Sequence, residues 1–124
     1  MRPDTDFEWE KWAQTQPFFS ILTNPIFLIE NWEENRDQFW DSGYRDVEHL
    51  FTPPPETKNA LEFGCGVGRI TKAMVERCEQ VVGLDVSPTM LKRAEEFAEG
   101  IPNVSYRLSD DELSAIDGQL FDFI

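Results

Sequence analysis

The sequence has few basic residues and few cysteines. Its 124 residues include 24 acidic but only 11 basic side chains, which gives a formal net charge of −13. A surface of this charge repels phosphate backbones, and no basic stripe offsets it, so we expect no nucleic-acid partner. The two cysteines, Cys65 and Cys78, lack metal-ligand spacing. We therefore expect free thiols in a reducing cytoplasm and no metal site.

Long apolar runs are also missing. The most apolar stretch, residues 18–29, is interrupted by Thr23, Asn24 and Pro25 and is too short to cross a bilayer. The N-terminus lacks the apolar core of a signal peptide. We therefore expect a cytoplasmic protein without membrane contact. The hydrophobic share of 40%, with ten phenylalanines and four tryptophans, indicates a packed globular chain.

The aromatic residues divide the chain into two parts. All tryptophans and most phenylalanines precede the proline-rich residues 52–59, and apolar side chains there follow helical spacing. We expect a short helix before Pro17 and a longer one over 29–51. Gly43 interrupts the longer helix, either as a kink or because another group approaches closely. These features predict an N-terminal helical cap with a stiff proline-rich connector over residues 1–57.

From residue 58 the pattern changes to alternating strands and helices. This order implies right-handed crossovers and a parallel α/β sheet with helices on its faces. The expected strands are residues 60–63, 80–86 and 103–109, and the expected helices between them are residues 69–78 and 87–100.

The last residues, 119–124, have the pattern of a fourth strand that no helix follows. A sheet that stops there has an open apolar edge, which favours pairing with another chain. We therefore expect the front part of a longer fold, truncated in its fourth strand, with self-association through the open edge.

Three glycines lie between the first expected strand and the following helix, in the stretch "EFGCGVG" over residues 62–68. Because Gly64, Gly66 and Gly68 lack Cβ atoms, a ligand can contact the backbone N–H groups at the helix start. In a doubly wound sheet, ligands bind at this end of the strands. A tight, flexible turn would need small residues as well, so the glycines alone leave both interpretations open.

Two acidic residues follow the next two strands and favour ligand binding. Asp85 ends the second strand, where a carboxylate can accept hydrogen bonds from both hydroxyls of a ribose. Asp110 follows the third strand, where it can accept from the exocyclic amine of a base; alternatively, it begins a short helix, where the helix dipole favours an acid. Together, the loop and the two acids predict a nucleoside-containing ligand.

The loop departs from the dinucleotide-binding pattern G-x-G-x-x-G. Gly68 comes one residue early, and Arg69 occupies the position of the third glycine. A carboxylate at Glu62 is poorly placed beside a pyrophosphate but can bind an ammonium group directly or through water. These departures disfavour a nicotinamide-dependent oxidoreductase and favour a nucleoside that carries an ammonium group.

These motifs resemble those of the class I S-adenosylmethionine-dependent methyltransferases. The matching stretches are "LEFGCGVGRIT" for the first motif, "VVGLDVSPTMLKRAEE" for the second, "NVSYRLSDDEL" for the third-strand region and "FDFI" for the start of the fourth strand. The resemblance covers residues 58–124 and implies a Rossmann-like, doubly wound parallel sheet that binds S-adenosylmethionine. Residues 1–57 match only loosely, as the variable helical cap of such enzymes.

The resemblance also implies roles for individual residues. The implied cofactor contacts are Glu62, Gly64, Cys65, Gly66 and Gly68 for the methionine moiety and its loop, Asp85 for the ribose hydroxyls, Asp110 for the adenine amine, and Val86 and Met90 for the adenine face. Residues that bind the acceptor and assist transfer usually follow the fourth strand, so the catalytic residues stay unknown.

The resemblance implies a methyltransferase that acts on a small-molecule acceptor. The alternative is a non-catalytic module that binds S-adenosylmethionine or another nucleoside, or a subunit completed by a partner chain. The cap has two interpretations as well. Its core is expected to consist of Trp12, Phe18, Phe19, Phe39, Trp40 and Tyr44; alternatively, Gly43, Tyr44 and some of Phe18 and Phe19 cover the cofactor pocket.

Overall fold

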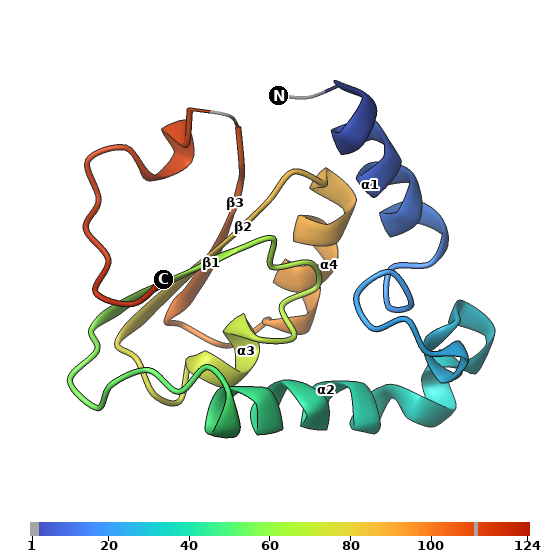
Figure 1. Ribbon diagram of the computed structural model, residues 1–124, viewed down its shortest axis with the longest axis horizontal. Helices are drawn as coiled ribbons and strands as arrows, with labels where there is room; N and C mark the ends of the chain where they lie inside the picture. Colours follow the sequence, from blue (N-terminus) through green and yellow to red (C-terminus); the bar gives the residue numbers. More distant parts are fainter. Residues whose placement is uncertain (1–2, 111) are drawn as a thin grey trace.

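The computed structural model describes residues 3–110 and 112–124. Two main helices form the N-terminal part, as the apolar spacing predicts, and Figure 1 shows the longer one along one side of the molecule. The N-terminal elements are α1 (Pro3–Thr15), the short 3₁₀ helices η1 (Pro25–Phe27) and η2 (Ile29–Asn31), and α2 (Trp32–His49).

Three parallel strands form one sheet in the order β1-β2-β3, with helical segments in the connections. This arrangement confirms the predicted Rossmann-like α/β fold. The elements are β1 (Asn59–Phe63), α3 (Thr71–Met74), β2 (Gln80–Asp85), α4 (Pro88–Phe97), β3 (Val104–Leu108) and the 3₁₀ helix η3 (Ser114–Ile116).

The central strand and α4 form for reasons that are local to their sequences. In β2, four consecutive residues, 81–84, are buried, as expected for a strand covered on both faces. At the start of α4, the Ser87 hydroxyl accepts a hydrogen bond from the Met90 N–H (3.1 Å), and Pro88 occupies the first helical position. The sequence therefore carries both the burial pattern of β2 and the start signal of α4.

The helix predicted over residues 69–78 is wrong in extent, because only α3 is regular. The Ala73 N–H donates to the Ile70 carbonyl (3.0 Å), and the Arg77 N–H donates to the Met74 carbonyl (2.9 Å). Such bonds between residues three apart tighten the backbone beyond α-helical geometry. The glycine loop is thus followed by a compact turn rather than a full helix.

The strand predicted over residues 119–124 is reduced to one isolated parallel bridge between Ala60 and Phe123. The Leu61 N–H donates to the Phe123 carbonyl (2.9 Å), and the Asp122 carboxylate accepts from the backbone N–H of Asn59 (2.9 Å). These bonds fix residues 122–123 beside β1, on the side that β2 does not occupy. The predicted strand therefore lies where it was expected, but it is much shorter than predicted.

The largest hydrophobic cluster is aromatic and joins the two parts of the chain. Phe18 stacks on Trp32 with ring centroids 3.4 Å apart, and Phe39 meets both rings edge-on. Val67 and Met90 belong to the same cluster, although both lie beyond the proline-rich connector. The boundary between residues 57 and 58 stays a prediction, since this cluster crosses it.

Two of the aromatic residues expected in the core of the cap lie at the surface. Trp12 is 43% exposed and Tyr44 is 38% exposed, so the prediction is wrong for both. Each has a buried neighbour on its own helix, Ala13 directly after Trp12 on α1 and Val47 one turn after Tyr44 on α2. Helical spacing located the buried faces of the helices approximately, but it did not distinguish buried aromatic residues from exposed ones beside them.

Candidate functional site

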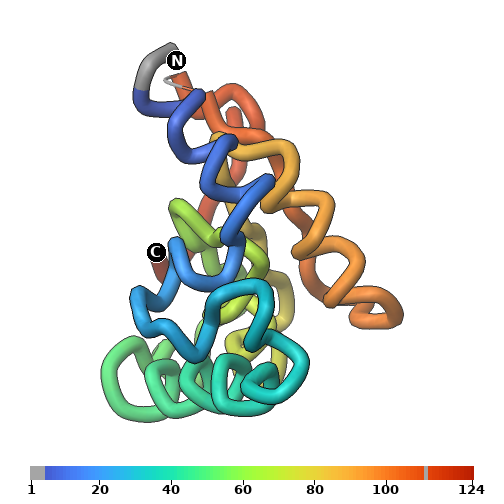
Figure 2. The backbone as a smooth tube through the Cα atoms, turned by 90° about the vertical axis from the view of Figure 1, so that its right-hand side faces the viewer, coloured from blue at the N-terminus to red at the C-terminus, as the bar shows by residue number. Residues whose placement is uncertain are grey.

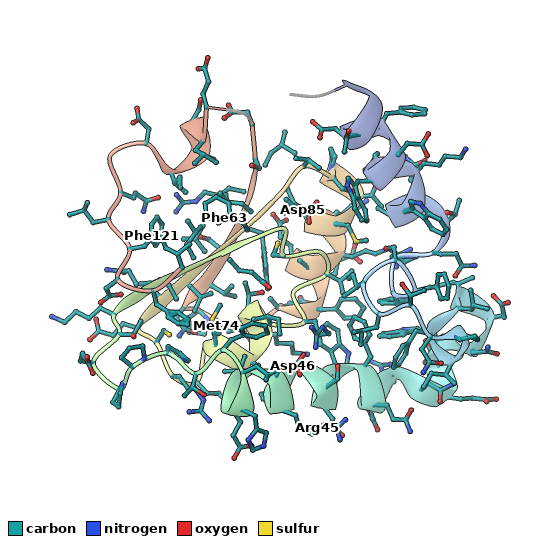
Figure 3. All side chains as sticks on the ribbon, in the orientation of Figure 1. Arg45, Asp46, Phe63, Met74, Asp85 and Phe121 are labelled. Atoms are coloured by element: carbon teal, nitrogen blue, oxygen red, sulfur yellow. The ribbon has the colours of Figure 1, made fainter. Side chains whose placement is uncertain are left out.

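A cavity of about 410 Å³ lies at the carboxyl ends of β1 and β2. Figure 3 shows Phe63 and Asp85, which end these two strands, at the same edge of the sheet. The cavity is lined by Trp9, Ser20, Ile21, Phe63, Gly64, Gly66, Asp85, Val86, Ser87, Met90 and Ser109. Five residues predicted to bind the cofactor are therefore brought together: Gly64, Gly66, Asp85, Val86 and Met90.

The glycine loop has a backbone that other residues rarely adopt. The φ angles of Gly64, Gly66 and Gly68 are +68°, +56° and +92°. A Cβ atom at Gly66 would lie 2.7 Å from the Cδ1 atom of Ile21, and one at Gly68 would lie 2.5 Å from the Tyr106 hydroxyl. The glycines thus allow left-handed turns and close packing, so the loop is more than a flexible connection.

Asp85 joins the glycine loop to the start of α4. One carboxylate oxygen accepts from the Gly66 N–H (2.8 Å), and the other accepts from the Ser87 N–H (3.0 Å). A carboxylate oxygen has two lone-pair directions, so each oxygen can accept a further hydrogen bond. Asp85 is therefore fixed in place while it faces the cavity and can still accept from two hydroxyl groups.

Glu62 carries a buried oxygen that lacks a partner. Its Oε1 atom has no hydrogen-bond partner among the described residues. Burial raises the pKa of this carboxyl from its usual 4.5 to about 8, and the Arg69 guanidinium opposes part of that rise. Glu62 lies outside the cavity lining, directly before Phe63 and Gly64. A buried carboxylate oxygen without a partner is well suited to accept from a ligand ammonium group.

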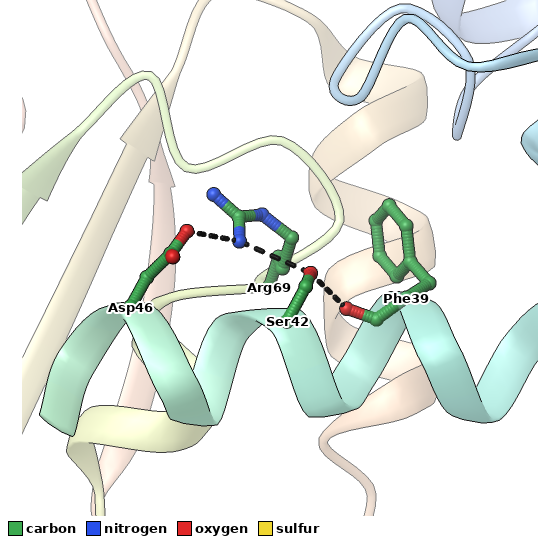
Figure 4. Close-up of polar contacts among 4 residues, drawn as sticks. All are labelled: Phe39, Ser42, Asp46 and Arg69. Atoms are coloured by element: carbon green, nitrogen blue, oxygen red, sulfur yellow. Dashed lines mark hydrogen bonds and ion pairs between the residues drawn. The ribbon is translucent and has the colours of Figure 1, made fainter. Parts of the chain in front are cut away.

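The cap is attached to the end of the glycine loop through Arg69. Its Nη1 atom donates to Asp46 (2.7 Å) and to the Ser42 hydroxyl (3.2 Å), both on α2, and Figure 4 shows these contacts. The α2 backbone also approaches the loop directly, because a Cβ atom at Gly43 would collide with the Arg69 carbonyl oxygen. Gly43 therefore marks a close approach of another group, which was one of its two predicted interpretations.

Besides Glu62, three residues predicted to bind the cofactor lie outside the cavity lining: Cys65, Gly68 and Asp110. A Cβ atom at Gly83 would lie 2.9 Å from the Cys65 sulfur, so this side chain fills space against β2. Its burial raises the pKa of the thiol, which disfavours a nucleophilic role. The cofactor contacts of Cys65 and Gly68 stay predictions.

Asp110 is exposed and is engaged in a local turn. Its Oδ1 atom accepts from the backbone N–H groups of Ser114 (2.9 Å) and Glu112 (3.1 Å). These bonds, with Ser114 first, lower the pKa of the carboxyl. The preceding residue, Ser109, lines the cavity in its place. The adenine contact of Asp110 stays a prediction, and its bonding matches the alternative that it begins a short helical turn.

The cap supplies three lining residues that the sequence analysis missed: Trp9, Ser20 and Ile21. The residues proposed there as a cover of the pocket, Gly43, Tyr44, Phe18 and Phe19, are all absent from the lining, so that alternative is wrong in its residues. No local pattern identifies the three that were missed, because they reach the cavity only through the path of the chain between α1 and α2. The aromatic residues of α1 can be seen in the sequence, but nothing there singles out Trp9 among them.

A larger groove of about 690 Å³ lies between residues 22–27 and α2. None of the glycine-loop or β2 residues lines it, so we assign the site to the cavity at the strand ends. Among the described residues, no group of three or more potential ligands could hold a metal ion. In the same part of the chain, no helix has the length and apolarity needed to span a membrane.

Relatives with known sequences match about half of the chain. A methyltransferase of Geobacillus kaustophilus is 35% identical over 82 residues, which make up 59% of this chain and 38% of that protein. Phosphoethanolamine N-methyltransferase 3 of Arabidopsis thaliana is 33% identical over 60 residues, 48% of this chain and 12% of that protein. The chain thus spans less than half the length of either relative.

A solved structure with a similar fold is phosphoethanolamine N-methyltransferase 1 of Haemonchus contortus, in complex with phosphoethanolamine and S-adenosylhomocysteine. The TM-score is 0.65 at 20% identity, over 86% of this chain and 21% of that one. At this identity, the likeness shows the fold. The family model of the methyltransferase domain matches residues 60–124, which is more than half of the chain. The chain therefore belongs to the methyltransferase domain family, as its motifs predicted.

Proposed function

We propose that this chain forms the S-adenosylmethionine-binding part of a methyltransferase that acts on a small molecule. The observation that carries the proposal is the cavity at the strand ends, where Asp85 and the glycine loop meet. The unpartnered Oε1 atom of Glu62 lies immediately before that loop in the chain. A ligand with a ribose at one end and an ammonium group at the other matches these two carboxylates.

The three parts of S-adenosylmethionine have separate partners in this proposal. Glu62 and the backbone of Gly64 and Gly66 bind the methionine moiety, because the loop offers N–H groups and the carboxyl ionises beside a bound ammonium group to give a counter-charge. Asp85 accepts from the ribose hydroxyls. The apolar side chains of Val86 and Met90 pack against the adenine, with Asp110 as a candidate for the adenine amine.

The bound cofactor would supply a methyl group on a positively charged sulfur. In the transfer, an oxygen, nitrogen or carbon atom of the acceptor forms a bond to this carbon as the carbon–sulfur bond breaks. The sulfur keeps the electron pair, and any proton on the attacking atom leaves to a base. The contribution of this chain is proximity and alignment, and none of its residues is assigned as that base.

Two observations support a small molecule as the methyl acceptor: the net charge of the chain and the names of its relatives. The net charge of −13 disfavours a polyanionic acceptor such as RNA or DNA. Two relatives carry the names phosphoethanolamine N-methyltransferase and ubiquinone biosynthesis O-methyltransferase, which indicate small-molecule acceptors for those proteins. An acceptor panel with small amines, phenols and short RNA would decide this point. Transfer to RNA alone would contradict the small-molecule proposal.

The first test is calorimetric titration of S-adenosylmethionine and S-adenosylhomocysteine into the full chain. We expect Asp85→Ala to weaken binding at least about tenfold, because a buried charge-assisted hydrogen bond contributes about 1.5–3 kcal/mol. Asp85→Asn serves as a milder variant if the alanine variant is poorly folded. The matched control is Asp37→Ala, which removes an exposed carboxylate from α2.

Two outcomes would contradict the proposal. Either wild-type protein binds neither ligand, or both Asp85 variants bind as tightly as the control. Binding without transfer to any acceptor would favour the second candidate, a non-catalytic nucleoside-binding module or a subunit completed by a partner. Affinity for NADH in place of both ligands would favour a nicotinamide-dependent enzyme.

A further inference from the structure

Helix α1 is attached to the start of α4 through one carboxylate. The Glu10 Oε1 atom accepts from the Thr89 N–H (2.8 Å) and from the Ser87 hydroxyl (3.1 Å). Figure 2 shows α1, at the blue end of the chain, beside the first turns of α4. The Thr89 N–H lies in the first turn of α4, so it has no partner within its own helix. Glu10 therefore satisfies a donor of α4, at a helix end where negative charge is favoured.

Apolar packing contributes little to this attachment. The large apolar side chains of α1 are substantially exposed, at 66% for Phe7, 49% for Trp9 and 43% for Trp12. Ala13 is the one apolar residue of the described part of α1 that reaches the aromatic cluster. Since the apolar contacts are few, the bonds of Glu10 largely determine where the middle of α1 lies against α4.

Trp9, the neighbour of Glu10, lines the cavity. The residues that Glu10 contacts, Ser87 and Thr89, lie on either side of Pro88 and directly follow Val86, which also lines the cavity. Asp85, Val86 and Met90 form the end of the cavity that the proposed function assigns to ribose and adenine. Trp9 is therefore placed at the nucleoside end rather than at the methionine end.

We propose that Glu10 is a positioning residue that holds Trp9 against the nucleoside end of the site. The inference rests on the proposed function, because it assigns a further contact of the same cavity. An indole ring has a flat apolar face on which a purine base can stack, and its other face can stay in water. In this arrangement α1 adds a wall to the site beside the start of α4, and its place depends on one hydrogen-bonded carboxylate.

The test measures binding of two ligands that share the nucleoside: S-adenosylhomocysteine and 5′-methylthioadenosine, which lacks the amino-acid part. We expect Trp9→Ala to weaken both by about tenfold, since one base–aromatic stack contributes that much or more. Trp9→Phe should restore most of the loss, because phenylalanine keeps a ring. Glu10→Ala should weaken both ligands by about three- to tenfold, and Glu10→Gln, which keeps one acceptor oxygen, by less.

A double-mutant cycle separates positioning from a general effect on folding. If Glu10 acts through Trp9, the Trp9→Ala/Glu10→Ala variant binds no more weakly than Trp9→Ala alone. A residue that only stabilises the fold would give additive losses. The matched control is Glu8→Ala, which removes an exposed carboxylate from the same helix and should leave both affinities unchanged. Should Glu10→Ala unfold, Glu10→Gln takes its place in the cycle.

The outcomes distinguish the inference from the proposed function. No binding of either ligand by wild-type protein contradicts the proposed function itself. Normal binding by wild-type protein, with Trp9→Ala and Glu10→Ala equal to the Glu8→Ala control, overturns only the inference. Additive losses in the double variant also overturn it, because they show that Glu10 acts independently of Trp9.

Discussion

The acid–base chemistry of Glu62 depends strongly on its surroundings. Burial raises the pKa of its carboxyl to about 8, compared with 4.5 in an unfolded chain. Between these two values the folded protein keeps a proton that the unfolded protein has lost. Its contribution to stability is therefore complete below the unfolded pKa and is lost as the pH rises through the folded pKa. Glu62 thus works against the stability of the ligand-free protein at neutral and alkaline pH.

The raised pKa of Glu62 predicts how the stability of the protein depends on pH. We expect the free energy of unfolding of the ligand-free protein to fall between about pH 5 and pH 8.5, as the linkage relation requires for a raised carboxyl pKa. Glu62→Gln cannot ionise, so most of this fall should disappear in that variant. Urea unfolding at several pH values measures the effect, with Glu56→Gln, an exposed site on the connector, as the control. An equal slope in the Glu62 variant and in wild type would contradict the assignment.

The position of Glu62 in the sequence was enough to propose it as a ligand residue, but it did not predict the raised pKa of its carboxyl. The motif places an acid two residues before Gly64, and this spacing can be seen in the sequence. The raised pKa comes from burial and is only partly opposed by the Arg69 guanidinium, which lies seven residues further along the chain. Burial of this kind depends on tertiary packing, so single-sequence patterns cannot supply it.

At the scale of elements, one contact between cap and sheet is the approach of α2 to the turn after the glycine loop. Gly43 lies in the interior of α2, where glycine normally lowers helix stability by about 1 kcal/mol relative to alanine. Here the missing Cβ atom makes room for the Arg69 carbonyl. The cost in helix propensity is offset by the close packing that the glycine allows.

Helix propensity alone would make Gly43→Ala stabilising, but the close contact with Arg69 leads us to expect the opposite effect on stability. We expect the variant to be destabilised by about 1–3 kcal/mol, the usual cost of forcing extra volume into a packed contact. Urea unfolding measures the change. Asp41→Ala, at an exposed position of the same helix, reports the propensity effect alone and should be neutral or slightly stabilising. A stabilised Gly43→Ala would show that α2 does not approach Arg69 in solution.

Elements with local signals were predicted well. The three strands and α4 were located from apolar runs and from the Ser87–Pro88 start signal, all of which lie within or next to the element. The helix predicted over residues 69–78 and the strand predicted over residues 119–124 are both longer than the elements observed, α3 and the bridge at Phe123. Their limits depend on contacts with distant residues, such as the bond from Leu61 to the Phe123 carbonyl. Local periodicity contains no information about such contacts.

For the whole molecule, the aromatic cluster makes cap and sheet a single packing unit. Val67 of the glycine loop and Met90 of α4 pack in the same cluster as the aromatic residues of the cap. The predicted division between residues 57 and 58 therefore does not correspond to a gap in the core. Two regions that share a core are expected to unfold together.

We expect a single unfolding transition for the whole chain. Tryptophan fluorescence, which reports on the cap because all four tryptophans precede residue 41, should coincide with far-ultraviolet circular dichroism, which reports on all elements. Met90→Ala should lower the free energy of unfolding obtained from both signals by the same amount, about 2–5 kcal/mol, the usual cost of truncating a buried methionine. Leu120→Ala, at a side chain that is 88% exposed, is the control and should shift neither. Two separated transitions would support independent domains.

The site was predictable only where one continuous segment contains it. Gly64, Gly66, Asp85, Val86 and Met90 lie within 27 residues of one another and follow a known motif order. Trp9 and Ile21 reach the same cavity from far earlier in the chain, through the packing of α1 and the segment that follows it. Predicting them requires the relative placement of cap and sheet, which the motif does not encode.

The position of Asp85 limits what substitution experiments at this residue can measure. Its two oxygens bind main-chain amides that belong to different parts of the site, Gly66 of the loop and Ser87 before α4. Removing the carboxylate would release both parts as well as any ribose hydroxyl. The affinity lost in Asp85→Ala is thus an upper bound on the strength of the sugar contact. A ligand series that lacks individual ribose hydroxyls, measured on the unaltered protein, would give the contact itself.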